Sequence, residues 1–277
     1  MAGAYFGYRN LFDGWTLNID GGPGTDNQPL AGFPLANMQA RQLSRVSRIT
    51  NLDTVSGNPL FIPFDAPAPF DANLVMVFGS APTSITLTIG ASNHTFPVFY
   101  SSDAAEIDLP RFSWLLIPPA YRTGIERVTL EYGMVFPPAY VEIGRVYVAN
   151  ALIVPDGVDV GWSLDVDDAG TVDASEGRQW YEERGKRTRR LGFAVSLRES
   201  TAVFGFAEGA TSASDVPSFQ AMQMLAGATG EVVVIPRSGT ELLVRRLAVY
   251  GHLERPLEIR NRSGLHFDVS GRVIEER

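Results

Sequence analysis

Short runs of apolar and polar residues, each bounded by Gly, Pro, Asn or Ser, recur along this chain of 277 residues. The run Ser84–Ile89 alternates strictly between polar and apolar positions, which is typical of a strand with one buried face. The run Val232–Ile235 is continuously apolar, which is typical of a strand buried on both faces. This run lies in a strand predicted at Glu231–Ile235. Similar runs predict further strands at Leu74–Phe78, Phe96–Tyr100, Ser113–Ile117, Arg127–Glu131, Val141–Val148, Val158–Val166, Arg190–Leu197, Glu241–Tyr250 and Leu265–Val269.

Helical periodicity is sparse. The clearest case is Asp215–Gly227, about residues 216–227, where Phe219, Met222 and Leu225 recur at helical spacing between an N-cap Asp and a terminal Gly. A weaker candidate is Leu35–Ser47. The first 70 residues are rich in Gly, Pro, Asn and Asp, so we expect irregular extended chain there. Large apolar side chains would anchor this arm: Phe6, Leu11, Phe12, Trp15, Phe33, Phe61, Phe64 and Phe70.

Because alternation dominates and helices are few, the pattern predicts a mainly all-β protein of two modules. Residues 1–144 are predicted to form an irregular N-terminal arm and a jelly-roll-like β-sandwich. Residues 145–277 are predicted to form a second β module with one helix. The boundary is placed near Glu142–Arg145, after two copies of Pro-Pro-Ala-Tyr that read as corners between strands.

An abrupt change of charge lies in the second module. From Asp156 to Glu176 there are seven acids and no base, and from Arg178 to Arg190 there are six bases against two acids. Opposite charges placed this way favour head-to-tail docking of identical copies, and such contacts close into rings when the rotation allows. The predicted interface pairs three acids of one copy with four bases of the next: Asp165, Asp167 and Asp168 with Arg184, Arg187, Arg189 and Arg190. Surface ion pairs contribute little, so apolar burial would supply affinity and the charges would set the register.

Composition narrows the function further. The net charge of −8 argues against a nucleic-acid-binding function. The basic patch Arg184–Arg190 is therefore expected to pair with carboxylates of a neighbouring copy, with nucleic acid as the alternative ligand. The chain has no Cys and therefore no disulfide, which fits assembly in a reducing cytoplasm. No run reaches the roughly 18 apolar residues of a membrane span, and the first residues lack the pattern of a signal peptide. We expect no membrane insertion.

One segment resembles a calcium loop. Asp165, Asp167, Gly170, Asp173 and Glu176 fall at the first, third, sixth, ninth and twelfth positions of an EF-hand loop. The fifth position offers no side-chain oxygen, and strand-like sequence precedes the loop. A solvated acidic turn or an interface is therefore the favoured interpretation, and calcium is the alternative.

Motifs of catalysis are absent from the sequence. The three His residues have no zinc spacing, and neither a nucleophile elbow nor a phosphate loop occurs. We therefore predict no enzyme, no cofactor and no metal, with a glycan hydrolase as a remote option. A carbohydrate-binding module is the main alternative, because several aromatic residues either fill the sandwich core or offer flat faces to sugar rings: Trp15, Tyr100, Trp114, Tyr121, Tyr132 and Tyr140.

Three segments carry a family resemblance. The segment Phe33–Thr50, FPLANMQARQLSRVSRIT, resembles the opening of galactose-binding-like sandwich domains in tail proteins of long-tailed bacteriophages. Gly144–Asp168 and Arg189–Gly205 are similar to the strand–loop–strand unit of phage tail-tip and tail-tube-like proteins. The resemblance implies a galactose-binding-like sandwich followed by a tail-tube-like module with a helix.

The resemblance also implies a function. It implies a structural subunit of a distal-tail or baseplate ring, commonly of six copies, located in the virion tail after assembly in the cytoplasm of the bacterial host. The expected partners are further copies of the chain and other tail proteins (tube, hub and fibres), without catalysis. The sandwich would either bind a host-surface glycan or only brace the ring. The long lead Gly14–Gly32 departs from the family pattern and leaves its docking role open.

Overall fold

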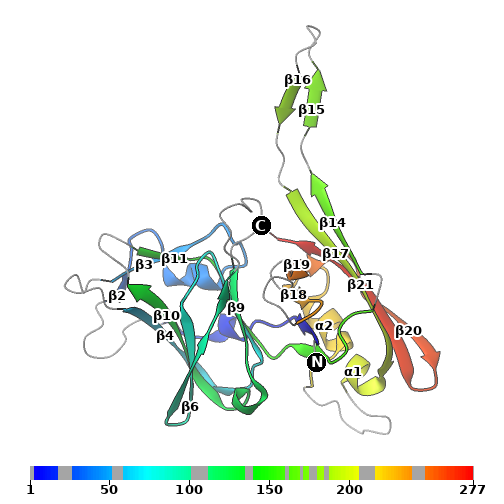
Figure 1. Ribbon diagram of the computed structural model, residues 1–277, viewed down its shortest axis with the longest axis horizontal. Coiled ribbons are helices and arrows are strands. Elements are labelled where there is room, and N and C mark those ends of the chain that lie inside the picture. The colour runs from blue at the N-terminus through cyan, green and yellow to red at the C-terminus, as the bar shows by residue number, and fades with distance from the viewer. Residues whose placement is uncertain are drawn as a thin grey trace. The chain divides into compact units, whose positions relative to one another are not determined.

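The computed structural model describes residues 3–17, 27–51, 59–100, 112–134, 140–159, 162–168, 171–174, 180–183, 187–205, 216–238 and 247–276. The chain divides into two compact units. The sandwich unit is Arg9–Ala151, and the sheet unit combines Met1–Tyr8 with Leu152–Arg277. Antiparallel sheets dominate both units (Figure 1), which confirms the mainly all-β fold class.

The sandwich unit contains two four-stranded sheets and one of three strands. The first sheet has the order β4 (Pro59–Phe70), β10 (Ile125–Met134), β6 (Ser84–Ile89), β7 (Ser92–Pro97). The second has the order β12 (Val146–Ala149), β5 (Leu74–Phe78), β9 (Phe112–Leu116), β8 (Phe99–Tyr100). The third has the order β11 (Tyr140–Ile143), β3 (Ser47–Asn51), β2 (Asn27–Pro29), and three 3-10 turns are η1 (Leu11–Gly14), η2 (Leu35–Gln39) and η3 (Pro119–Tyr121).

One apolar core lies between the two four-stranded sheets. The pleat of β6 turns Ile85 and Leu87 inward, and β5 contributes Val75 and Val77 to the same core. The chain changes sheet after β4, β5, β7 and β9, as it does in a jelly roll. The predicted β-sandwich is therefore confirmed. The strand predicted at Ser84–Ile89 is β6 of its first sheet, with the same bounds.

A buried arginine ties the N-terminal part of the sandwich unit to its second sheet. Arg145 is 1% exposed and makes two hydrogen bonds to Asp13 of η1, of 2.6 Å from Nη1 and 2.7 Å from Nη2. Asn10 adds a backbone link, because its Oδ1 accepts from the N–H of Val148 at 2.9 Å. A bidentate ion pair of this kind fixes the relative orientation of the guanidinium and the carboxylate as well as their distance.

The sheet unit is one large sheet with two short helices. The sheet has the order β13 (Leu152–Val154), β1 (Ala4–Gly7), β18 (Val232–Ile235), β19 (Val249–Leu253), β21 (His266–Glu275), β17 (Arg187–Glu199), β14 (Ser163–Asp168), and β20 (Glu258–Ser263) also pairs with β21. A separate two-stranded ribbon consists of β15 (Thr171–Ala174) and β16 (Trp180–Glu183). The helices are α1 (Ser200–Phe204) and α2 (Phe219–Ala226).

Helix α2 confirms the main helical prediction with shorter bounds. Its N-cap is Ser218, whose hydroxyl accepts from the N–H of Ala221 at 3.1 Å, and Gly227 ends it with a positive φ of 53°. Phe219 packs into the core against Phe6, with ring centroids 5.1 Å apart. Leu225 was predicted to share this buried face and is 60% exposed.

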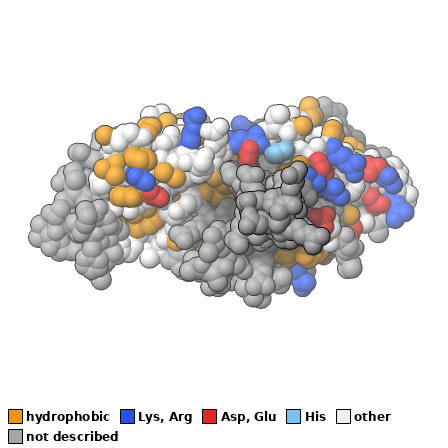
Figure 2. Space-filling view, turned by 90° about the horizontal axis from the view of Figure 1, so that it is seen from above, with side chains coloured by type: hydrophobic (Ala, Val, Ile, Leu, Met, Phe, Trp, Pro, Cys, Tyr) orange, Lys and Arg blue, Asp and Glu red, His pale blue; other side chains and the backbone are white. Residues whose placement is uncertain are grey.

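The surface of the sheet unit carries mixed charge at the hairpin of β20 and β21. Figure 2 shows basic and acidic side chains interspersed at the end of the molecule where Figure 1 labels β20. Arg260 pairs with Glu258 at 2.5 Å and Arg262 with Asp268 at 2.7 Å. These exposed local pairs leave no patch of a single sign on the hairpin.

Three sequence-based expectations are corrected here. The boundary between the units lies after Ala151 rather than after residue 144, and residues 1–8 belong to the second unit because β1 pairs with β13 and β18. The supposedly irregular first 70 residues include the twelve-residue strand β4. The candidate helix Leu35–Ser47 is a 3-10 turn that gives way to strand β3.

Some predicted strands also have other bounds. Val141–Val148 divides at Gly144–Arg145 into β11 and β12, which lie in different sheets. In the sheet unit, α1 is a second helix where one was expected. The buried strand Val232–Ile235 is confirmed, with all four residues inaccessible to solvent.

Candidate functional site: an open sheet edge and a polar groove

The acidic and basic segments singled out in the sequence pair with each other within one chain. Strands β14 and β17 are antiparallel, and their register sets Asp165 opposite Arg190 and Asp168 opposite Arg187. The two segments therefore pair through their backbones inside the subunit before any second copy is considered.

Arg189 does not belong to an interface with a neighbour. Its side chain is 4% exposed, and it binds Glu275 of β21, which is itself buried. Arg189 Nε donates to Glu275 Oε1 at 2.8 Å, and Nη2 donates to the carbonyl of Ala248 at 3.0 Å. The prediction that Arg189 meets acids of another copy is wrong, because residues alternate between the faces of a strand and this one points inward.

The remaining predicted interface residues lie on or beside the same strand pair. Asp165 is exposed on β14, and Arg190 is half-buried on β17. The backbone places Asp167 and Asp168 on β14 and Arg187 at the start of β17. Arg184 lies outside the described residues.

Strand β14 forms one edge of the large sheet. It pairs with β17 and with no other strand in the described part of the chain. Val166 on this strand is 56% exposed, and Trp162, immediately before it, is 38% exposed. An edge strand presents a row of unpaired N–H and C=O groups, and exposed apolar side chains beside them make such an edge a template for another chain.

The ribbon of β15 and β16 joins β14 to β17. Residues 169–170 separate β14 from β15, and residues 184–186 separate β16 from β17. The ribbon sets Thr171 opposite Glu183 and Ala174 opposite Trp180, and neither strand pairs with a third described strand. A two-stranded hairpin by itself is at best marginally stable in water. Packing against another protein surface would therefore stabilise the ribbon.

The calcium-loop interpretation is not supported by the local fold. Asp165 and Asp167 lie on strand β14, and Asp173 lies on strand β15, where an EF-hand needs one continuous loop that turns its oxygens toward a centre. Gly170 and Glu176 lie outside the described residues. Among the described residues, no group of three or more His, Cys, Asp or Glu side chains is placed to hold a metal ion.

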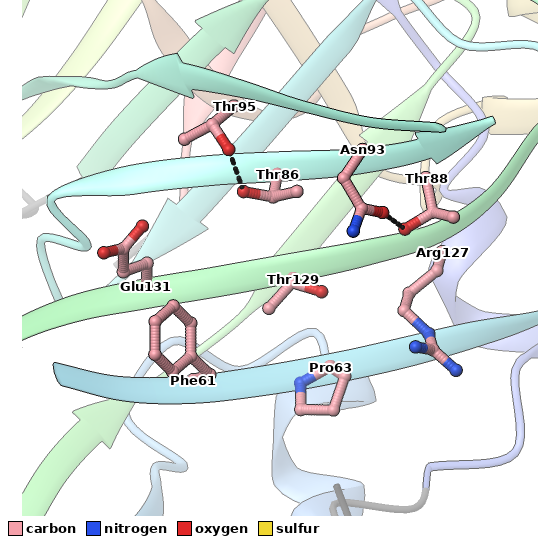
Figure 3. A pocket seen from close by; sticks show the side chains of 9 residues that line it. All are labelled: Phe61, Pro63, Thr86, Thr88, Asn93, Thr95, Arg127, Thr129 and Glu131. Atoms are coloured by element: carbon pink, nitrogen blue, oxygen red, sulfur yellow. Dashed lines mark hydrogen bonds between the residues drawn. The ribbon is translucent and has the colours of Figure 1, made fainter. Parts of the chain in front are cut away.

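A second candidate site lies on the outer face of the first sheet of the sandwich unit. The pleat that sends Ile85 and Leu87 into the core turns Thr86 and Thr88 outward. The neighbouring strands follow the same alternation, and together they line a hollow of about 480 Å³: Phe61, Pro63, Thr86, Thr88, Asn93, Thr95, Arg127, Thr129 and Glu131 (Figure 3). We call this hollow the sheet groove.

The register arranges the sheet groove in rows that cross the four strands. The middle row runs from Pro63 through Thr129 and Thr86 to Thr95. Glu131 and Arg127 lie on either side of Thr129 along β10, so an acid and a base stand at opposite ends (Figure 3). Phe61, opposite Glu131 in the register, adds an aromatic ring that is 39% exposed.

Hydrogen bonds organise the groove's polar side chains. The hydroxyls of Thr86 and Thr95 are 2.7 Å apart, and Thr88 donates to Asn93 Oδ1 at 2.8 Å (Figure 3). Outside the row of threonines, Arg127 Nε donates to Asp65 at 2.5 Å. These contacts hold the side chains in place before any ligand arrives.

The six aromatic residues considered for sugar binding differ in their exposure. Trp15, Trp114 and Tyr132 are buried, as the core interpretation of these residues predicted. Tyr121 is half-buried, and the side chain of Tyr100 lies outside the description. Tyr140 is 42% exposed, but its ring lies over Arg48, which also contacts Phe33. Phe61 was expected to anchor the arm. The residues around it, Leu60–Phe64, are all apolar, so the sequence carries no local signal that Phe61 faces outward.

Comparisons with known proteins do not identify this chain. No protein-family model, curated protein sequence or solved structure matches it. No helix in the described residues is both long enough and apolar enough to cross a membrane.

Proposed function

We propose that this protein is a structural subunit that assembles with copies of itself into a ring, and that the ring belongs to the tail tip of a bacteriophage. The observation that carries the assembly is the open edge at β14, where Val166 and Trp162 are exposed beside unpaired backbone groups. The setting in a distal-tail or baseplate ring follows from the resemblance of Gly144–Asp168 and Arg189–Gly205 to tail-tip proteins.

The edge supplies the two kinds of interaction that a specific contact needs. Backbone N–H and C=O groups of β14 give direction, and Val166 with Trp162 gives apolar area to bury. Asp165, exposed on the same strand, adds charge that selects the register of the partner. In the proposed ring, this edge and the adjoining ribbon of β15 and β16 dock on a different surface of the next copy, which is the arrangement that closes a ring.

This proposal changes the interface first read from the sequence. Arg189 of β17 is buried against Glu275 of the same chain, and β14 pairs with β17 inside the subunit, so apolar and backbone contacts at the edge replace the interchain ion pairs as the main source of affinity. The proposed partners are further copies, in a hexamer by resemblance, together with tube, hub and fibre proteins of the tail. The proposed location is the virion tail, after assembly in the host cytoplasm.

The test is a single charge placed on the edge. Wild-type protein should form an oligomer in solution, and Val166→Lys should shift it to a monomer of 30.2 kDa, measured by light scattering coupled to size exclusion. An edge lysine is a device by which natural sheets block pairing. Leu265→Lys is the matched control, because Leu265 is 44% exposed at the far hairpin of the same unit.

Two outcomes would contradict the proposal. One is a wild-type protein that stays monomeric at high concentration. The other is a Val166→Lys variant that assembles as the wild type does. Circular dichroism of both variants verifies that each is folded, so loss of assembly is not confused with loss of the fold.

A further inference from the structure

We infer that the sheet groove of the sandwich unit binds a neutral oligosaccharide. The groove lies in the other unit from the proposed assembly edge, so the inference does not depend on ring formation. It depends on three observations: a row of hydroxyls with free hydrogen-bonding capacity, an exposed aromatic ring at one side, and balanced charge.

The first observation is the state of the polar side chains. The hydroxyl of Thr129, in the centre of the groove, is bonded to no other described residue. Asn93 uses its oxygen to accept from Thr88, and among the described residues nothing accepts from its amide nitrogen. The hydrogen bond of Arg127 to Asp65 uses Nε, which leaves its two terminal nitrogens to donate. Donors and acceptors therefore alternate over a short distance.

Sugar hydroxyls match this mixture because each of them both donates and accepts. A ligand rich in hydroxyls satisfies threonine hydroxyls, an amide and a guanidinium together, whereas an apolar ligand would leave these groups unpaired. The hydroxyl pair of Thr86 and Thr95 is already oriented, so less freedom is lost on binding.

The second observation is Phe61. Its ring is 39% exposed and lies on β4 beside Pro63, so one side of the groove is apolar while the floor is polar. A pyranose ring has the same division, with a face of C–H groups and an edge of hydroxyls. Aromatic side chains favour such contacts because they offer a large, rigid apolar surface.

The third observation separates a neutral ligand from a charged one. The groove holds Arg127 and Glu131 at opposite ends, and Arg127 already pairs with Asp65. An anionic ligand, whether an acidic sugar or a nucleic acid, would meet as much negative as positive charge, and binding of nucleic acid needs a clear excess of positive charge. A neutral chain of sugars meets no such penalty.

The size of the groove favours an oligosaccharide over a single sugar. Four strands at about 4.8 Å spacing span about 14 Å, and the three rows extend a similar length along the strands. Side chains of all four strands line the hollow of about 480 Å³. A ligand that contacts both Phe61 on β4 and Thr95 on β7 must cross this whole width.

The experiment uses the full chain on a printed array of oligosaccharides, followed by calorimetry of the bound sugars. The neutral set contains short chains of glucose, galactose, mannose and N-acetylglucosamine, and the acidic set contains chains of glucuronic and galacturonic acid. We expect binding to members of the neutral set. Phe61→Ala and Thr129→Val should each weaken it by about tenfold, through loss of the aromatic contact and of one hydrogen bond.

Matched controls identify the groove as the site. Leu265→Ala removes an exposed apolar side chain in the other unit, and Thr123→Val makes the same change as Thr129→Val at an exposed position outside the groove. Both should bind as the wild type does. Val166→Lys should also bind normally, so a failure of ring assembly and a failure of sugar binding give different results.

The inference is overturned by any of three results. These are no binding to the array, binding confined to the acidic set, or neutral binding that survives both Phe61→Ala and Thr129→Val. Binding of neutral sugars that falls in the two groove variants and persists in the three other variants would support it.

Discussion

Two edge strands of this protein differ in proline content: β4 in the sandwich unit is rich in proline, and β14 in the sheet unit has none. Strand β4 contains Pro59 and Pro63 within its paired region, and Pro67 and Pro69 lie where the register with β10 is interrupted. Strand β14 has no proline and exposes Val166. Since proline lacks the N–H that a further strand would need, β4 is blocked as a template and β14 is left open.

This difference indicates that β14, rather than β4, pairs with another chain. Proteins suppress accidental pairing at edges with proline, charge and irregularity, and β4 combines proline with a bulge. Strand β14 carries acids but no proline, and its Val166 is exposed, so its backbone N–H groups are not blocked in the way that those of β4 are. The difference supports assembly through β14 and leaves the sheet that contains β4 to present its outer face, the sheet groove.

The strand next to each edge is held by a buried polar group. Strand β17 beside β14 carries Arg189, which binds Glu275 of β21. Strand β10 beside β4 carries Tyr132, whose hydroxyl is 2.7 Å from that of Ser80. The first contact is an ion pair with both partners buried, and the second is a neutral hydrogen bond. Removing one partner should therefore have a much larger effect in the sheet unit.

The largest expected effect is that of Glu275→Ala. It leaves the guanidinium of Arg189 buried without its carboxylate, and breaking a buried pair in this way costs about 3–5 kcal/mol. The free energy of unfolding of the sheet unit should fall by that amount while the sandwich unit is unchanged. Hydrogen exchange resolved by peptide measures the two units separately, which a single melting curve of a two-unit chain does not.

A control and a rescue sharpen this prediction. Glu258→Ala removes an acid whose side chain is 51% exposed and which pairs with Arg260, so it should cost at most about 1 kcal/mol. Arg189→Met combined with Glu275→Leu should recover most of the lost stability, because a well-packed apolar pair replaces a buried ion pair at little cost. If Glu275→Ala and Glu258→Ala had equal effects, the buried pair would not hold β17 in place.

The intermediate effect is that of Tyr132→Phe, and it depends on pH. Burial raises the pKa of the Tyr132 hydroxyl, and the hydrogen bond to Ser80 opposes that rise only in part. The folded unit therefore keeps the proton above the unfolded pKa of about 10, so the stability is complete below that pH and is lost as the pH rises beyond it. At pH 7 the variant should lose about 1 kcal/mol with the hydrogen bond.

The pH dependence distinguishes this role from simple packing. Above about pH 10 the wild-type sandwich unit should lose stability that the variant, without an ionisable group, keeps, so the two should converge. Pulse proteolysis in urea at neutral and alkaline pH, with the fragments of the sandwich unit identified by mass, measures the difference. A constant gap between wild type and variant across this range would show that the ionisation of Tyr132 is not linked to folding.

Within the sheet that contains the groove, the sequence predicted strand β6 but not the edge strand β4. Ser84–Ile89 was predicted as a half-buried strand, and the structure gives the same bounds with Thr86 and Thr88 outside. The strand β4 was missed because four prolines read as breakers, although proline is tolerated at an edge. Residues 61–65 read Phe-Ile-Pro-Phe-Asp and do not alternate, so only the pairing of β4 with β10 shows this segment as a strand.

Features that depend on distant pairing could not be read from local pattern. Tyr5 pairs with Ile235, which moves the first eight residues into the second unit, and no property of either segment alone encodes that contact. The sheet groove likewise needs the register of β4, β10, β6 and β7. The charge switch was visible in the sequence, but only the pairing of β14 with β17 shows that its two halves meet in one chain.

The smallest expected effect on stability, and the most direct test of the contrast between the edges, is that of Pro63→Thr. Position 63 lies opposite Thr129 in the ladder, and threonine is well suited to a strand. The ring of Pro63 lines the sheet groove and is only half-buried, so its replacement removes little packing. The free energy of unfolding should therefore change by about 0.5 kcal/mol or less.

The variant should instead change association. Threonine restores an N–H on the open side of β4, so Pro63→Thr combined with Val166→Lys should associate weakly through the sandwich unit, whereas Val166→Lys alone stays monomeric. Sedimentation velocity over a range of concentrations measures the difference. If the two proteins sedimented alike, the bulge at β4 would suffice to block that edge, and proline would not be the element that distinguishes it from β14.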